Sequence, residues 1–181
     1  MRKLLHIIKI KVGNYSLKKI SKPQIEHSFI NWDNITRIKL LFTRTSDFFA
    51  DELSSFAREL VKQGKIVDVL IHIDRKKLDD SYKNRKNVEY YCRKDLTWLG
   101  KPKLETVENF IITKSDLLIV PVFEEILHIK WISVMCNTKM IVAPFSEKNQ
   151  WANILIKLGD NSIEQFLEQT VHYLKMINKN R

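Results

Sequence analysis

The stretch Ser115–Pro144, SDLLIVPVFEEILHIKWISVMCNTKMIVAP, decides the fold. It contains two continuous apolar runs, Asp116–Val122 and Met140–Ala143, and a proline stands at the far end of each. Strands that are apolar on both faces are typical of a parallel sheet covered by helices. The stretch therefore predicts a buried strand, a helix and a second buried strand.

The helix predicted between these strands, residues 124–136, is apolar over an unusually wide arc. At about 100° per residue its apolar side chains spread over roughly 220°, which exceeds the stripe of an ordinary surface helix. His128 lies near the middle of this arc, where we expect a hydrogen-bonded core or interface histidine. Something besides the sheet should cover this helix. The candidates are the N-terminal helix, a second copy of the chain or a protein partner, with His128, Trp131 and Met135 at the interface.

Strand and helix patterns alternate along the rest of the chain. We predict strands at 35–42, 66–73, 88–92 and 152–158, and helices at 47–63, 104–112 and 162–177. Such alternation implies a parallel sheet with right-handed crossovers. The predicted fold is α/β, with three layers and a mostly parallel sheet of five to six strands, Rossmann-like or flavodoxin-like. The first strand should be central with the fourth beside it, which places the topological switch point between them.

Two regions divide the chain. Residues 31–181 are predicted to form a single α/β domain, and residues 1–30 a basic amphipathic helix with a connector. This extra N-terminal helix either caps the domain or anchors it to a membrane surface or a partner. The polar segment 76–87 is either an exposed helix or a loop.

The 181-residue chain carries a net charge of +10. This excess favours an anionic partner such as RNA, a ribosome, a nucleotide or a membrane surface, although the codon bias of an AT-rich genome produces the same excess of lysine. No apolar run is long enough to span a membrane, and the N-terminus does not resemble a signal peptide. Cys92 and Cys136 are expected to be buried thiols without a disulfide partner, which fits a reducing cytoplasm.

Ligands of such a sheet bind outside the carboxyl ends of the strands. The first loop at that edge, Thr43–Asp47, contains no glycine. It therefore fits neither a dinucleotide fingerprint nor a P-loop, which both need glycines to bring the backbone close to phosphate. Ser46 or Asp47 is expected to cap the following helix, whereas Arg44 can hold an anion.

Acidic residues also fall at this edge. Glu124 and Glu125 are predicted to open the 124–136 helix, where negative charge favours the helix dipole. The alternative is that one of them serves as a base or a metal ligand. Asp74 and Asp95 follow two other strands, but the spacing does not support a Mg²⁺ site. We predict no bound metal and no cofactor.

The loop RKDLTWLGK, residues 93–101, is the most distinctive of the chain. Trp98 stands beside Arg93, Lys94 and Lys101, a combination that can stack a nucleobase and bind its phosphate. The alternative is that Trp98 folds back onto the domain.

Several segments together resemble a family of uncharacterised bacterial proteins, a domain of unknown function. They are the basic N-terminal helix, RKDLTWLGK before a helix that ends in NFI, SDLLIVPV, ISVMCNTKMIVA and the final HYLKMINK. The resemblance covers most of the chain and implies no activity. A looser similarity is to one half of a two-domain sugar-nucleotide glycosyltransferase, whose second half, and hence the cleft between the halves, the chain lacks. That similarity therefore does not imply transferase activity.

We expect a non-catalytic cytoplasmic module that binds an anionic partner, RNA or a ribonucleoprotein, or that assembles with itself or a protein through the 124–136 helix. The alternative is a small enzyme or sensor for a nucleotide or phosphorylated metabolite. Its ligand-binding residues would be Arg44, Ser46, Asp74, Arg93, Asp95, Trp98 and Glu124. A second alternative is a peripheral membrane protein that uses the first helix, although the sequence disfavours a membrane partner.

Overall fold

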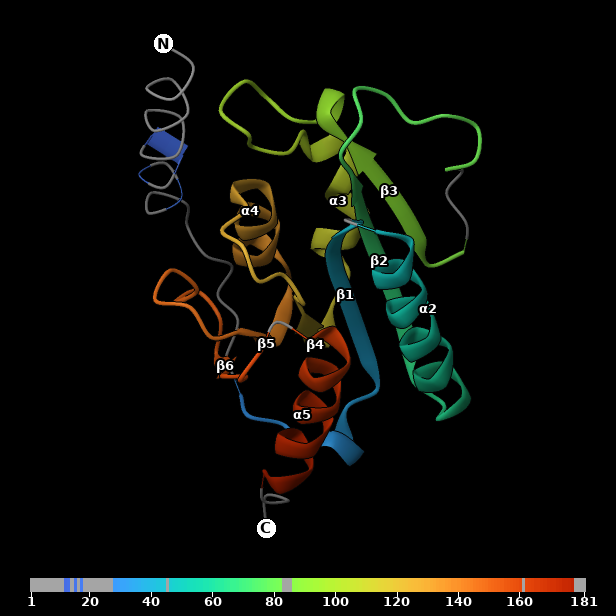
Figure 1. Cartoon of the computed structure of the whole chain (residues 1–181), viewed down its shortest axis with the longest axis vertical. Coiled ribbons are helices and arrows are strands. Elements are labelled where there is room, and N and C mark those ends of the chain that lie inside the picture. Colours follow the sequence, from blue (N-terminus) through green and yellow to red (C-terminus); the bar gives the residue numbers. More distant parts are fainter. Residues whose placement is uncertain are drawn as a thin grey trace.

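The computed structural model describes residues 12, 13, 15, 17, 28–44, 46–82, 86–160 and 162–177. Its strands are β1 (Arg37–Arg44), β2 (Ile66–Ile73), β3 (Val88–Cys92), β4 (Ser115–Ile119), β5 (Thr138–Pro144) and β6 (Ile154–Ile156). Its longer helices are α2 (Asp47–Lys62), α3 (Leu104–Ile112), α4 (Leu127–Met135) and α5 (Ile163–Met176). The strands form one open sheet in the order β3-β2-β1-β4-β5-β6, and every pair is parallel (Figure 1). The α/β fold is confirmed, and β1 lies beside β4 as expected.

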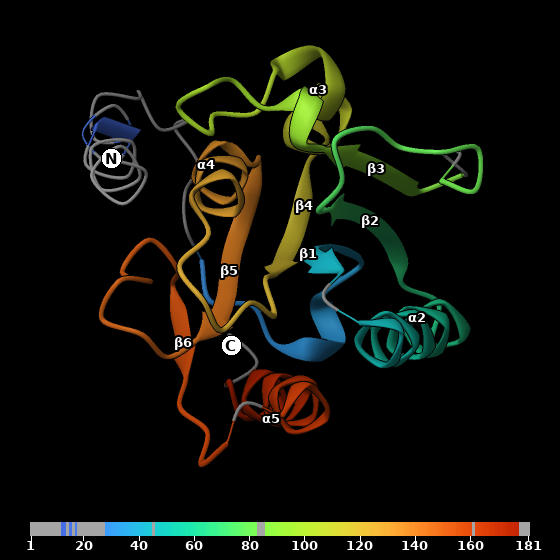
Figure 2. The same ribbon diagram turned by 45° about the horizontal axis from the view of Figure 1, so that its top comes forward.

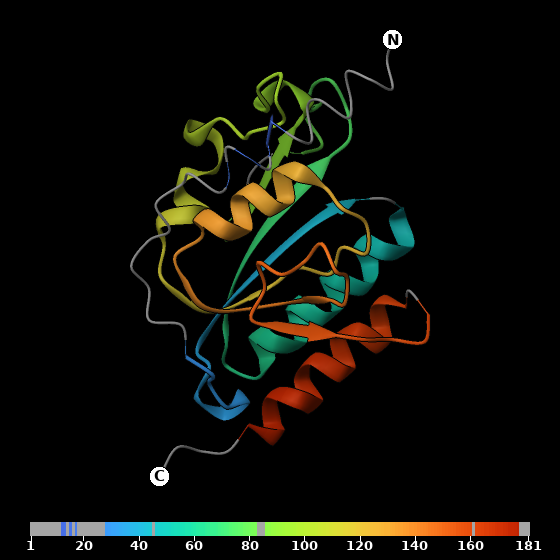
Figure 3. The same cartoon turned by 90° about the vertical axis from the view of Figure 1, so that its left-hand side faces the viewer.

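Helices cover both faces of the sheet. Figure 3 shows α2 and α5 on one face and α3 and α4 on the other. Successive side chains of a strand point to opposite faces. Leu40 of β1 accordingly packs into the core on the α2–α5 side, and the adjacent Leu41 packs into the core on the α3–α4 side. This double burial explains why the strands have continuous apolar sequences.

Two helix ends are fixed by local sequence signals. The backbone of Gly64 has φ 81°, and its N–H donates to the carbonyl of Val61, while the Lys65 N–H donates to that of Leu60. These two bonds form a Schellman motif, which ends α2. At the start of α5, the Ser162 hydroxyl accepts the Gln165 N–H at 3.3 Å and caps the helix.

The segment between β4 and α4 differs from the prediction. The helix begins at Leu127, so Glu124 and Glu125 precede it and do not form its first turn. Phe123 packs against Phe166 of α5 on one face of the sheet, with ring centroids 6.3 Å apart, whereas Ile126 packs into the core on the other face. Between Phe123 and Ile126 the chain passes over the carboxyl ends of the strands from one face of the sheet to the other. The helix therefore begins only at Leu127.

The wide apolar arc of α4 is buried within the chain. Trp131 is 3% exposed and His128 is 9% exposed, whereas Met135 is half-buried. Figure 2 shows α4 beside β5 on this face of the sheet, and Gly13 lies against the helix: a Cβ atom on Gly13 would stand 2.5 Å from Cδ2 of Leu127. Leu17, like Gly13, is helical and buried. The remaining residues of the predicted N-terminal helix lie outside the described residues.

The central strand also buries a charged residue. Lys39 of β1 is fully buried on the α3–α4 side, where its Nζ donates to the carbonyl of Thr113 and lies 3.3 Å from Sγ of Cys136. Burial lowers the pKa of Lys39 and raises the pKa of the Cys136 thiol. The amine satisfies a carbonyl just past α3 and contacts the residue that ends α4, so it connects both helices to the sheet.

The burial of Phe166 leads to a stability prediction. Phe166→Ala removes a fully buried ring and should lower the free energy of unfolding by about 3–5 kcal/mol. Urea denaturation followed by tryptophan fluorescence measures the change. The matched control is Phe145→Ala, because Phe145 is 53% exposed and its removal should cost less than about 1 kcal/mol. Similar losses in both variants would contradict the core packing.

Candidate functional site

The carboxyl ends of β1, β2 and β3 meet at one edge of the sheet, at the top of Figure 1. Asp74 follows β2 and Arg93 follows β3, and their side chains form a bidentate ion pair. Nε of Arg93 lies 2.5 Å from Oδ1 of Asp74, and Nη2 lies 2.8 Å from Oδ2. The guanidinium group lowers the pKa of Asp74. This carboxylate is thus ionised and already engaged with its neighbour.

Asp95 has a structural partner as well. It closes the short 3-10 turn η2 (Arg93–Asp95), in which its Oδ2 accepts the Cys92 N–H at 2.9 Å and lies 3.3 Å from Sγ of Cys92. The side chain therefore holds the turn that leads from β3 into the distinctive loop.

Arg44 closes β1 and reaches the loop after β2. Its Nη1 lies 3.4 Å from the hydroxyl of Tyr82, and its guanidinium carbon lies 5.7 Å from the centre of the Tyr82 ring. Arg75 lies at the same distance from that ring. Two guanidinium groups thus share one phenol ring, an arrangement that stabilises both by cation–π attraction.

The other predicted residues are exposed. Ser46 precedes α2, and its carbonyl accepts the Ala50 N–H. Glu124 lies between β4 and α4 beside a hollow of about 10 Å³, which has room for about one water molecule. Trp98 is 74% exposed, so of the two alternatives for this residue the one in which it folds back onto the domain is wrong.

The fold therefore brings together only part of the predicted set. Asp74, Arg93 and Asp95 meet around the ends of β2 and β3. Arg44 is engaged with Tyr82, Trp98 projects into solvent, and Ser46 and Glu124 flank the switch point between β1 and β4.

Sequence reasoning missed a buried aromatic cluster behind this edge. The hydroxyl of Tyr91 lies 2.8 Å from Nδ1 of His128, and the ring of His72 lies 4.1 Å from that of His128 and 5.0 Å from that of Tyr91. His72 and Tyr91 occupy paired positions of β2 and β3. Neither ring nitrogen of His72 has a hydrogen-bond partner among the described residues. The sequence did contain one signal for the contact between His72 and Tyr91, because each residue is the last but one of its predicted strand.

Burial shifts the pKa values of two members of this cluster, His72 and Tyr91. It lowers the pKa of His72 to about 4, although the nearby Asp74 acts in the opposite direction, and it raises the pKa of Tyr91 well above its usual value. At neutral pH both side chains are therefore uncharged. Within the described ranges, no three histidine, cysteine or acidic side chains are grouped so that they could hold a metal ion.

Comparison with known proteins identifies the family. The model of a family of unknown function (DUF6913) matches residues 9–177. The chain belongs to this family. The expected membership of an uncharacterised family is thereby confirmed, whereas the looser similarity to a glycosyltransferase receives no support. A search of the curated proteins finds no match. Among the described residues, none of the helices has the length and apolar character needed to cross a membrane.

The low pKa of His72 makes stability depend on pH. Between pH 6.5 and about 4 the unfolded chain binds a proton that the folded chain does not, so the free energy of unfolding should fall as the pH falls through this window. The contribution amounts to about 3 kcal/mol across the window. His72→Phe should remove it and, because it also removes two unpaired nitrogens, should stabilise the fold at neutral pH by about 1 kcal/mol.

Urea denaturation at a series of pH values measures this effect. His172→Phe is the matched control, because His172 lies exposed on α5. A pH dependence that is the same in His72→Phe and in the wild type would show that His72 titrates normally.

Proposed function

We propose that the protein is a non-catalytic module that binds single-stranded RNA through the loop between β3 and α3. The 74% exposure of Trp98 carries the proposal. Large aromatic side chains are usually buried, and an indole presented to solvent offers a flat surface on which a nucleobase stacks.

The loop holds Trp98 in a fixed position. Leu96 and Pro102 form an antiparallel bridge, the Thr97 N–H donates to the carbonyl of Lys101 at 2.8 Å, and the Lys103 N–H donates to that of Asp95 at 2.8 Å. A loop that is ordered before binding loses less entropy when the ligand arrives. The hydrogen bonds that order this loop therefore favour a binding role for the exposed indole ring.

The charges of the loop suit a phosphate backbone. Lys94 and Lys103 are exposed, and Lys101 lies with its Nζ 5.2 Å from the centre of the Trp131 ring. The one acidic residue of this loop, Asp95, is engaged with the Cys92 N–H. The lysines thus leave an excess of positive charge beside Trp98, and such charge supplies most of the affinity of sequence-independent binding.

The same edge has features that favour binding over catalysis. A general base needs a pKa near the working pH and an accessible atom. Asp74 is locked in an ion pair, and His72 is buried with its pKa lowered to about 4. Neither side chain meets both requirements.

Removal of the indole tests the stacking role. Trp98→Ala should weaken binding to a fluorescein-labelled oligouridylate by roughly 5- to 150-fold, because stacking contributes about 1–3 kcal/mol per base. Fluorescence anisotropy measures the affinity. Tyr173→Ala is the matched control, since Tyr173 is 47% exposed on α5, and its affinity should stay unchanged. Wild-type affinity in Trp98→Ala, or no binding by the wild type at low salt, contradicts the proposal.

Salt dependence tests the phosphate contacts. If Lys94 neutralises one phosphate, Lys94→Gln should reduce the slope of log affinity against log salt by about 0.7. The measurement repeats the titration over a series of KCl concentrations. Lys175→Gln, which removes an exposed lysine of α5, should leave the slope as in the wild type. An unchanged slope in Lys94→Gln would mean that this lysine does not contact the backbone.

A further inference from the structure

The connection from β2 to β3 lacks the kind of helix that the crossovers from β1 to β2 and from β4 to β5 contain. A right-handed crossover from β2 to β3 runs over the same face of the sheet as α2, and in parallel sheets such crossovers normally supply a covering helix. Here the described residues of the connection, 74–82 and 86–87, contain no helix. The place beside α2, above β2 and β3, is therefore left without the helix that the topology leads us to expect.

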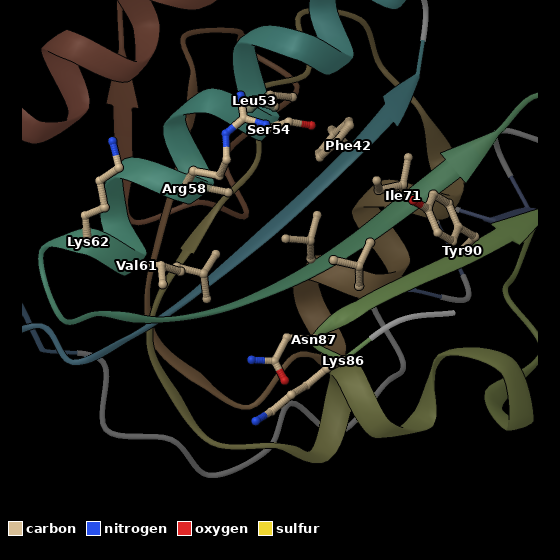
Figure 4. A pocket seen from close by; sticks show the side chains of 14 residues that line it. Phe42, Leu53, Ser54, Arg58, Val61, Lys62, Ile71, Lys86, Asn87 and Tyr90 are labelled. Atoms are coloured by element: carbon tan, nitrogen blue, oxygen red, sulfur yellow. The ribbon is translucent and has the colours of Figure 1, made fainter. Parts of the chain in front are cut away.

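A groove lies at this place (Figure 4). Its volume is about 600 Å³, and its floor is formed by apolar side chains of three strands. Ala57 and Val61 of α2 form one wall, and Val61 is 57% exposed. The floor side chains of Ile71, Val88 and Tyr90 remain half-buried. The groove thus offers an apolar surface alongside a helix, which is the surface that a second helix of the layer would cover.

Cationic side chains stand on both sides of this groove. Arg58 and Lys62 belong to α2, whereas Lys86 precedes β3 on the opposite side. Figure 4 shows Arg58 directed toward Ser54 and far from Lys86. No acidic side chain is among the described residues that line the groove. The positive charges are therefore spread over both sides and do not converge on one point.

The cations are not equally available. Lys62 pairs with Glu59 outside the groove at 3.3 Å, which offsets part of its charge. The ion pairs among the described residues include neither Arg58 nor Lys86. A ligand can therefore engage these two cations without displacing an acidic side chain of the described part of the chain.

We propose that this groove binds an acidic amphipathic helix of a protein partner, which takes the place of the missing crossover helix. The apolar stripe of the partner helix would lie on the floor of the groove. Its acidic flanks would face Arg58 on one side and Lys86 on the other. A ligand with a single anionic group would engage only one of these cations. The site lies apart from the Trp98 loop and does not depend on RNA binding.

Fluorescence anisotropy of the full chain with a labelled synthetic helix tests the proposal. The probe is a peptide of about 18 residues, or about five helical turns, with leucines along one stripe and glutamates on both flanks. Its binding should saturate at one site. A peptide with lysine in place of every glutamate should bind more weakly by about tenfold or more, because it loses the charge match. A glutamate peptide with a central proline should weaken by a similar factor, because proline breaks the helix.

Variants of the groove locate the probe. Arg58→Gln with Lys86→Gln should weaken the glutamate peptide by about tenfold. Ala57→Trp should fill the groove and abolish binding. Val61→Glu places an acid on an exposed position of the wall, so it keeps the test decisive if the tryptophan variant does not fold. Lys175→Gln on α5 is the matched control for a lost positive charge, and it should bind as the wild type does.

Three results would overturn the proposal. The first is no saturable binding of the glutamate peptide, or equal binding of the lysine peptide. The second is wild-type affinity in the folded groove variants, or a loss of affinity in Trp98→Ala, either of which means that the helix lies elsewhere. The third is dimerisation of the chain alone that Val61→Glu abolishes in sedimentation velocity, which would make a second copy the occupant.

Discussion

A parallel sheet whose strands are apolar on both sides must be covered on both sides, and this constraint organises the molecule. The α3–α4 side meets it, because strand side chains that face it, such as Leu41, Leu70 and Leu118, are fully buried. The opposite side meets it only in part, because the connection from β2 to β3 contributes no helix in its described residues. Both faces of the sheet need an apolar cover. The apolar helix α4 is part of that cover on one face, and the groove beside α2 marks where the cover is incomplete on the other.

Elements with strong local signals could be predicted closely from the sequence. The bounds predicted for β2, β3 and α3 agree with the structure, and Gly64 and Ser162 provide local signals at two helix ends. The start of α4 could not be predicted in this way. It depends on the contact between Phe123 and Phe166, which are distant in the sequence. Glu124 and Glu125 are a local signal for the start of a helix, but the contact between Phe123 and Phe166 overrides this signal.

The location of the candidate site could be predicted from the sequence, but the arrangement of its side chains could not. The rule that ligands bind at the carboxyl ends of parallel strands pointed to Asp74, Arg93 and Trp98. It could not show that the first two neutralise each other and that the third projects into solvent. The contacts of His72 with His128 and of Lys39 with Cys136 join distant elements. Lys39 finds a carbonyl acceptor, whereas both ring nitrogens of His72 have no hydrogen-bond partner among the described residues, and periodicity alone reveals neither outcome.

The positions of the charges distinguish a functional excess from codon bias better than the net charge of +10 does. Codon bias adds lysines without regard to where acids lie. At the carboxyl edge, however, Asp74, Asp79 and Asp95 are each engaged by a neighbouring group, so the exposed lysines beside them are left uncompensated. Arg58, Lys62 and Lys86 likewise line the groove beside α2, with no acid among its described lining residues. The exposed lysines beside Trp98 therefore support the proposed anionic ligand, which the net charge alone does not.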